Sequence, residues 1–181
     1  MKLNFLKKLS LFFLSACILW TCERDDICAE STATTPRLVL EFFDISNQTE
    51  SKNVPNLRVQ GVGNNFPLAD VNIETTNRVL LPLKTNENST SFLFHRDYGI
   101  DDNGTPDDTT DDTITGNEDV ITVTYTREDV YVSRACGYKT IFRNVAITIE
   151  DDGDRWISLI QSATDNQSVE DETTIHFNFF H

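Results

Sequence analysis

Apolar and polar residues alternate with a period of two along most of this chain from residue 37 onward, and no segment shows a convincing stripe with the helical period of 3.6. The clearest case is Val120–Arg127, where Ile121, Val123 and Tyr125 are interleaved with threonines. Because β-branched and aromatic residues suit the pleated surface of a sheet, the pattern predicts an all-β fold. The expected strands are 37–44, 57–62, 71–75, 79–83, 91–96, 120–127, 138–150, 155–161 and 173–180.

The turns between these segments contain Asn, Gly and Pro, which break strands and favour tight reversals. Eight or nine short strands at this spacing predict a single antiparallel β-sandwich, immunoglobulin-like in general character, with a small β-barrel as the alternative. The aromatic last segment, 173–180, indicates that the C-terminus is part of a sheet. In 138–150 the alternation places four residues on one inward face: Ile141, Val145, Ile147 and Ile149.

The sequence also predicts whether its histidines and aromatic residues lie on the surface or in the core. His95 and His176 each stand alone at a polar position of an expected strand, and we expect both on the surface. Trp156 and the phenylalanines are expected to fill the core before they form a carbohydrate platform.

The first 21 residues have the form of an export signal. Three lysines precede the apolar run Leu9–Trp20, which is too short to cross a bilayer, since crossing takes about 20 residues. Cys22 ends this run and is followed at once by the charged residues 23–26, as in bacterial lipoproteins. We expect residues 1–21 to be a lipoprotein signal peptide, 22–36 a lipid tether and linker, and 37–181 the β-sandwich domain.

Two cysteines compete for the lipid. The residues before Cys17 fit a lipidation signal better, but lipidation of Cys17 would leave an odd number of exported cysteines. Lipidation of Cys22 removes Cys17 with the signal and leaves Cys28 and Cys136, which can form one disulfide in an oxidising compartment. We therefore favour Cys22, with Cys17 and an unlipidated secretory signal as alternatives. Two buried reduced thiols are the alternative to the disulfide.

Residues 97–119 form an acidic insert with nine Asp and Glu residues and no Lys or Arg. Part of it resembles Asp-rich calcium repeats, in which oxygen ligands alternate around a glycine turn. Asp101, Asn103, Asp107 and Asp111 are the candidate calcium ligands, with Asp108 or Asp112 as further choices. A solvated acidic hairpin loop is the alternative, because runs of charge are usually just that. The Asp-Thr pairs of the insert are also candidate O-glycosylation sites.

The net charge and the absence of known catalytic and metal-binding motifs reduce the number of possible functional classes. The formal net charge is −14, and removal of the three lysines of the signal would change it to −17. Such a surface repels phosphate backbones, so we expect no nucleic-acid partner and a membrane attachment that depends on the lipid. The sequence has no nucleophile elbow, phosphate-binding glycine loop, zinc-type cysteine pairs or His-Glu-x-x-His. We expect no enzymatic activity and no cofactor other than calcium.

Several motifs resemble an uncharacterised lipoprotein family of flavobacteria and their relatives. They are Cys22–Cys28, Thr35–Leu38, Tyr125–Glu128 and Val132–Tyr138. The resemblance implies an envelope lipoprotein of unknown function with a lipidated first cysteine, and the long acidic insert departs from the family pattern. The acidic residues after Cys22 resemble a surface-export signal of this group and favour the outer membrane.

Three functional classes remain open at this point. The preferred one is a non-enzymatic module that binds an envelope protein or supports an assembly in the membrane. The second is a binder of a ligand or glycan, which needs a concave surface. The third is a hydrolase whose catalytic residues come from distant loops.

Overall fold

Strands alone make up the regular structure of the residues described by the computed structural model, which are 27–32 and 34–181. The all-β prediction is confirmed. In that part of the chain no helix is long and apolar enough to span a bilayer. The strands are β1 (Leu38–Phe43), β2 (Val54–Gly61), β3 (Pro67–Thr76), β4 (Arg78–Leu81), β5 (Ser89–Asp101), β6 (Thr113–Ser133), β7 (Gly137–Ile149), β8 (Leu159–Ser162) and β9 (Phe177–Phe180).

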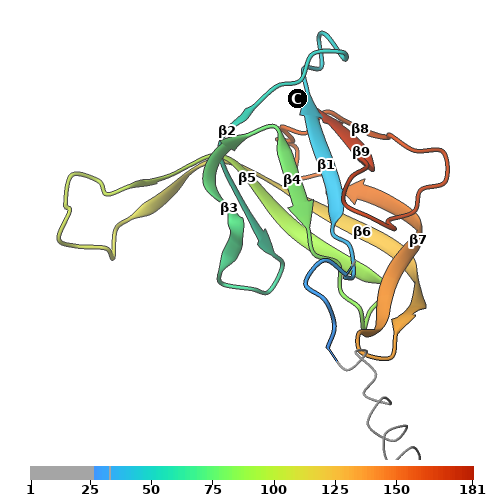
Figure 1. The fold of residues 1–181 in the computed structure, drawn as a ribbon. Coiled ribbons are helices and arrows are strands. Elements are labelled where there is room, and N and C mark those ends of the chain that lie inside the picture. Colours follow the sequence, from blue (N-terminus) through green and yellow to red (C-terminus); the bar gives the residue numbers. More distant parts are fainter. Residues whose placement is uncertain (1–26, 33) are drawn as a thin grey trace, which may run out of the picture. The chain divides into compact units, whose positions relative to one another are not determined.

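The strands form two sheets, one with the order β4-β1-β9-β8 and the other with the order β3-β2-β5-β6-β7 (Figure 1). One hydrophobic core contains side chains of both sheets, such as Leu40 and Phe179 from the first, and Phe94 and Val123 from the second. The alternation predicted for β6 is confirmed, because Ile121, Val123 and Tyr125 are all buried in this core. Two sheets around a shared core match the predicted sandwich.

The described residues divide into two compact units. The first contains 27–32 and 131–138, and the second contains 34–130 and 139–181. The hydrophobic core lies entirely in the second unit.

The C-terminal strand β9 is paired on both sides. It runs antiparallel to β8 and parallel to β1, with Leu40 opposite Phe177 and Phe43 opposite Phe180. The expectation that the C-terminus is part of a sheet is thus confirmed. The parallel pair is an exception in this part of the chain, since β4 with β1, β2 with β3 and β5, β5 with β6, and β8 with β9 all pair antiparallel.

Ile141 of β7 is buried, but it does not share a face with Val145 as the alternation predicted. Phe142, not Ile141, is part of the core cluster, and Val145 continues the inward face. Asn144 lies between them with a φ of 51°, a left-handed conformation that Asn tolerates. Its side-chain amide donates to the Thr126 hydroxyl of β6 at 3.2 Å. This irregularity shifts the alternation by one residue, because strand faces alternate with every position.

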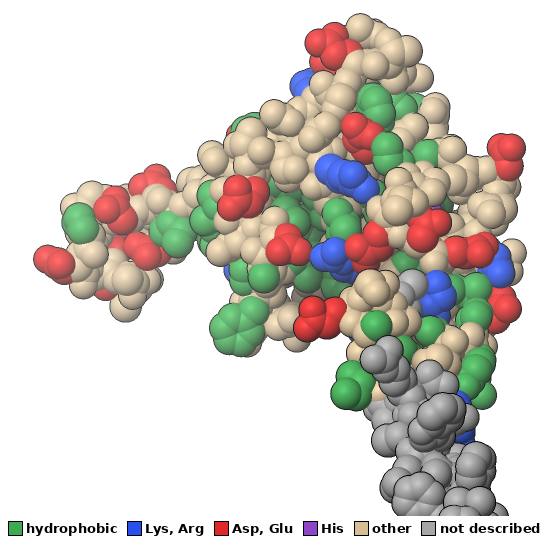
Figure 2. Space-filling view, in the orientation of Figure 1, with side chains coloured by type: hydrophobic (Ala, Val, Ile, Leu, Met, Phe, Trp, Pro, Cys, Tyr) green, Lys and Arg blue, Asp and Glu red, His purple; other side chains and the backbone are tan. Residues whose placement is uncertain are grey.

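The acidic insert is mostly a hairpin rather than a loop. β5 and β6 stay paired as far as Asp101 opposite Thr113, so the connection proper is 102–112. The register shifts between Arg96 and Gly99, and Gly116 lies opposite this shift with a φ of 104°. A Cβ at Gly116 would lie 2.4 Å from the carbonyl oxygen of Arg96, so only glycine fits there. The hairpin projects from its sheet and carries exposed carboxylates (Figures 1 and 2).

A buried carboxylate holds the segment that enters β8. Asp119 is fully buried and accepts hydrogen bonds from the amides of Trp156, at 3.1 Å, and Ile157, at 2.7 Å. Burial, the largest cause, raises the pKa of Asp119 above its ordinary value. Trp156 packs in the core as expected, and its indole N–H donates to the carbonyl oxygen of Phe94.

Candidate functional site

The disulfide predicted between Cys28 and Cys136 is present, with Cα atoms 4.9 Å apart. Both cysteines belong to the first compact unit. The bond joins the segment before β1 to the turn between β6 and β7, across 108 positions of sequence. Reduced thiols are therefore excluded for this pair in the structure. Cys17 and Cys22, the two candidates for lipidation, and the signal peptide 1–21 lie outside the described residues.

The candidate calcium ligands lie near the connection 102–112, and their polar contacts are local. Asp101 accepts a hydrogen bond from the amide of Asn103 at 3.0 Å, and Asp111 accepts one from the hydroxyl of Thr105 at 2.9 Å. Across 27–32 and 34–181, no group of three or more His, Cys, Asp and Glu side chains is arranged to hold a metal ion. The assignment of calcium to Asp101, Asn103, Asp107 and Asp111 stays a prediction.

The histidine predictions are wrong. His95 is 9% exposed and His176 is 3% exposed, so neither is a surface side chain. A ring nitrogen of His95, Nε2, lies 2.9 Å from the carbonyl oxygen of Thr115 on the neighbouring strand β6. His176 precedes β9 by one residue and is not on a strand at all. Strand alternation misplaces both side chains, because the ring of His95 contacts Thr115 of the neighbouring strand and the ring of His176, in a loop, contacts Val39 of β1.

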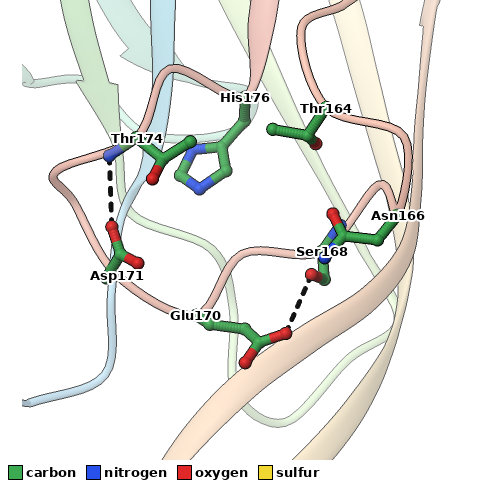
Figure 3. A pocket seen from close by; sticks show the side chains of 7 residues that line it. All are labelled: Thr164, Asn166, Ser168, Glu170, Asp171, Thr174 and His176. Carbon is green, nitrogen blue, oxygen red and sulfur yellow. Dashed lines mark hydrogen bonds between the residues drawn. The ribbon is translucent and has the colours of Figure 1, made fainter.

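A polar pocket of about 270 Å³ opens beside His176 and is formed within the connection between β8 and β9 (Figure 3). Its lining contains no aliphatic residue and no Phe, Tyr or Trp. The lining residues are Thr164, Asn166, Ser168, Glu170, Asp171, Thr174 and His176. The volume lies just below the range of typical ligand sites, so the pocket suits a small ligand.

His176 has one nitrogen in a structural contact and the other at the pocket. Its Nδ1 accepts a hydrogen bond from the amide of Val39 on β1 at 2.9 Å. The proton of the neutral ring is therefore on Nε2. In Figure 3 the nitrogen on the side away from β1 is turned toward the open centre of the pocket. Burial, the largest cause, lowers the pKa of His176, so the ring stays neutral at neutral pH.

The two carboxylates of the pocket are already engaged. Glu170 forms an ion pair with Arg143 of β7 and accepts a hydrogen bond from the Ser168 hydroxyl at 3.0 Å. Asp171 accepts bonds from the hydroxyl of Thr173 at 2.7 Å and from the amide of Thr174 at 3.1 Å, and these bonds lower its pKa. These contacts fix the shape of the loop and leave carboxylate lone pairs for a ligand.

Two lining atoms have hydrogen-bonding capacity that no described residue uses. The hydroxyl of Thr164 is buried without a partner, and Nε2 of His176 has none either. A buried polar group without a partner is costly, so such atoms indicate a place where a ligand can bind.

The histidine and the serine of the pocket do not form a nucleophile–base pair. A general base needs a free lone pair, and the lone pair of His176 is used by the amide of Val39. The Ser168 hydroxyl donates to Glu170 and not to a histidine. The pocket can instead offer a donor from His176 and acceptors from Thr164 and Asp171 to a small hydroxyl-bearing or cationic molecule.

The sequence contained little that could have located this pocket. Asp171 and Thr173 form a side-chain turn, which an Asp-x-Thr spelling can suggest. The remaining lining residues show no periodicity, and the pocket exists only because the loop folds back on itself.

Comparisons with known proteins give one match. A protein-family model described as "Family of unknown function (DUF6452)" matches residues 56–181, which is more than half of the chain. No curated protein and no solved structure matches the chain.

Proposed function

The chain belongs to the Family of unknown function (DUF6452). For this member we propose a lipid-anchored protein of the cell envelope with a non-enzymatic role in binding or assembly support. Three observations support this proposal: the export signal, the pairing of Cys28 with Cys136, and the chemistry of the pocket beside His176.

The disulfide carries the proposal. Disulfides persist in oxidising compartments outside the cytosol, as an exported protein requires. Because Cys28 and Cys136 pair with each other, Cys22 is left as the cysteine without a disulfide partner in a mature chain that starts there. A lipid on Cys22 uses that thiol. The resemblance to flavobacterial lipoproteins and the acidic residues Glu23, Asp25 and Asp26 favour the outer membrane.

Intact mass of the membrane-extracted protein tests the anchor. We expect a chain that starts at Cys22 and carries the added mass of acyl groups. Cys22→Ala should abolish the lipid, and Cys17→Ala should leave it unchanged. A lipid that survives Cys22→Ala but is lost in Cys17→Ala would assign the anchor to Cys17. An unmodified mature chain would contradict lipidation altogether.

A binding role with a protein partner can be tested on the acidic hairpin. Residues 102–112 can be replaced by an Asn-Gly turn, which keeps Asp101 opposite Thr113 and leaves the paired strands intact. Cross-linked co-purification from envelope membranes should yield a stoichiometric partner with the parent protein. Loss of that partner in the short-hairpin variant would place the contact on this connection. Absence of a partner in both samples would contradict the assembly role.

A second candidate function is the binding of a small polar ligand, favoured by the unpartnered hydroxyl of Thr164 at the pocket. The lining has no Phe, Tyr or Trp on which the sugar rings of a glycan chain could stack. It therefore suits a small polyol or amino sugar better. Monosaccharides and amino sugars can be screened by their effect on the melting temperature. A shift that is lost in Thr164→Val, which replaces the hydroxyl with a methyl group of similar size, would support the site. No shift with any of these probes would contradict it.

A further inference from the structure

An exposed aromatic pair flanks the turn between β6 and β7, with Tyr131 near the end of β6 and Tyr138 near the start of β7. The rings of Tyr131 and Tyr138 lie edge to face with centroids 5.4 Å apart. Tyr131 is 55% exposed and Tyr138 is 69% exposed, and Ile27 of the same compact unit is 84% exposed. Large apolar side chains that gather on the surface mark a place where another surface binds.

A shallow hollow of about 470 Å³ lies in this unit. Its apolar lining comes from Ile27, Ala29, Tyr131 and Ala135, and its other lining residues are Thr32, Ser133, Arg134 and the disulfide cysteine Cys136. The hollow is therefore built around the covalent link between the N-terminal segment and the turn between β6 and β7.

The charge of this unit differs from that of the whole protein. Its described residues, 27–32 and 131–138, contain one acidic residue, Glu30, and one basic residue, Arg134. They are formally neutral, whereas the full chain has a net charge of −14. A neutral surface is not repelled by lipid headgroups, and tyrosine rings are enriched at membrane–water interfaces.

The short segment between Cys22 and Cys28 limits how far this surface can lie from the bilayer. Cys22 precedes Cys28 by six residues, and six extended residues span at most about 20 Å. The headgroup layer on one side of a bilayer is on the order of 5 to 8 Å thick. A lipid on Cys22 therefore keeps the disulfide, and with it the tyrosine pair, within reach of the membrane surface.

We propose that Tyr131, Tyr138 and Ile27 form a membrane-contact surface that rests on the lipid headgroups of the bilayer to which Cys22 anchors the chain. This inference depends on the lipid anchor put forward above. The occupant is the bilayer itself, and the described residues of the unit that meets it have no net charge. The turn between β6 and β7 then acts as a second point of contact, so the first unit is held at the interface by more than its acyl chains.

Fluorescence quenching by lipids tests the proposal on the full mature protein. Tyr131→Trp and Tyr138→Trp are reconstituted separately into phosphatidylcholine vesicles with and without brominated acyl chains. The parent protein, whose Trp156 is buried, gives the background. Phe66→Trp is the matched control, because Phe66 is an exposed aromatic ring, 76% exposed, in the other compact unit. We expect brominated lipids to quench both introduced tryptophans more than the parent and more than Phe66→Trp.

Vesicle flotation separates the two proposals. Flotation of all variants together with selective quenching at positions 131 and 138 supports the membrane-contact surface. Flotation without quenching above the parent would overturn it and leave the anchor intact, as would equal quenching at position 66. Failure of the mature protein to float would overturn the anchor, and this inference with it.

Discussion

The amide of Val39 donates a hydrogen bond to Nδ1 of His176 at 2.9 Å, while the carbonyl oxygen of Val39 accepts one from the amide of His176 at 3.0 Å. Both backbone groups of Val39 are thus hydrogen-bonded to His176, just before the point where β1 begins to pair with β9. Val39 and His176 are both buried. The same contact sets the tautomer of the ring at the polar pocket, so one bond links the packing of β1 to the chemistry of the site.

Substitution of His176 tests this bond. His176→Phe leaves the buried amide of Val39 without an acceptor and should lower the free energy of unfolding by about 1–3 kcal/mol. His176→Asn should cost less, since its side-chain oxygen is separated from Cα by the same number of bonds as Nδ1. Denaturant unfolding measures both variants. Equal losses would contradict the importance of the acceptor.

The pH dependence of stability should also reflect His176. Burial lowers its pKa in the folded state below the ordinary value of 6.5. Between these two pKa values the unfolded chain binds more protons, so stability is complete above about 6.5 and is lost as the pH falls through this window. Burial lowers the pKa of His181 in the same direction. His176→Asn should therefore reduce the slope of unfolding free energy against pH without abolishing it; an unchanged slope would argue against this origin.

Asp119 should show the opposite dependence. Its pKa is raised, so the folded state binds more protons than the unfolded state at pH values between 3.8 and its folded pKa. Stability due to this group falls as the pH rises through that window. Asp119→Asn loses an acceptor for Trp156 and Ile157 but has no charge to desolvate. We expect its stability deficit to be larger at acid pH than at neutral pH; a deficit independent of pH would contradict this account.

Reduction of the disulfide should destabilise the protein. The bond closes a loop of just over a hundred residues, for which loop-closure entropy gives an upper estimate of about 4–5 kcal/mol. We expect Cys28→Ser/Cys136→Ser and the reduced parent to unfold at similar, lower denaturant concentrations. The double variant serves as the control, because reductant should not change its transition. No effect of reductant on the parent would show that the bond contributes nothing.

The calcium hypothesis makes a separate prediction for the acidic hairpin. Carboxylate ligands that bind calcium would raise the melting temperature when calcium is added, and Asp101→Asn/Asp107→Asn should remove this rise. Asp151→Asn/Asp152→Asn, in an acidic turn between β7 and β8, is the matched control and should keep it. A rise that persists in the first variant, or none in the parent, would contradict calcium binding at this hairpin.

Strand alternation predicted the sheets because it is a local property. β6 buries the apolar residues of the predicted alternation, Ile121, Val123 and Tyr125. Alternation did not predict the left-handed conformation of Asn144, which shifts the inward face of β7 between Phe142 and Val145. Alternation alone also gave no hint that β9 lies parallel to β1, since pairing partners are chosen by the packing of the whole sheet.

The cysteine count predicted the disulfide, because an even number of exported thiols constrains pairing regardless of fold. The pocket beside His176 was out of reach of such arguments. Its polar residues belong to a connection without regular structure, and the burial of His176 results from contact with Val39, 137 positions earlier in the chain. Local sequence carries no information on a contact of that range.

The parallel pairing of β9 with β1 also governs the order in which the protein can fold. β1 is made early during synthesis, yet one of its edges has no partner until the last strand emerges 137 positions later. Contacts of such long range close slowly, because a long stretch of chain must be ordered first. Until then the exposed edge of β1 is a template for other strands. Pairing with β9 therefore ends the period in which this edge of β1 can bind strands of other chains.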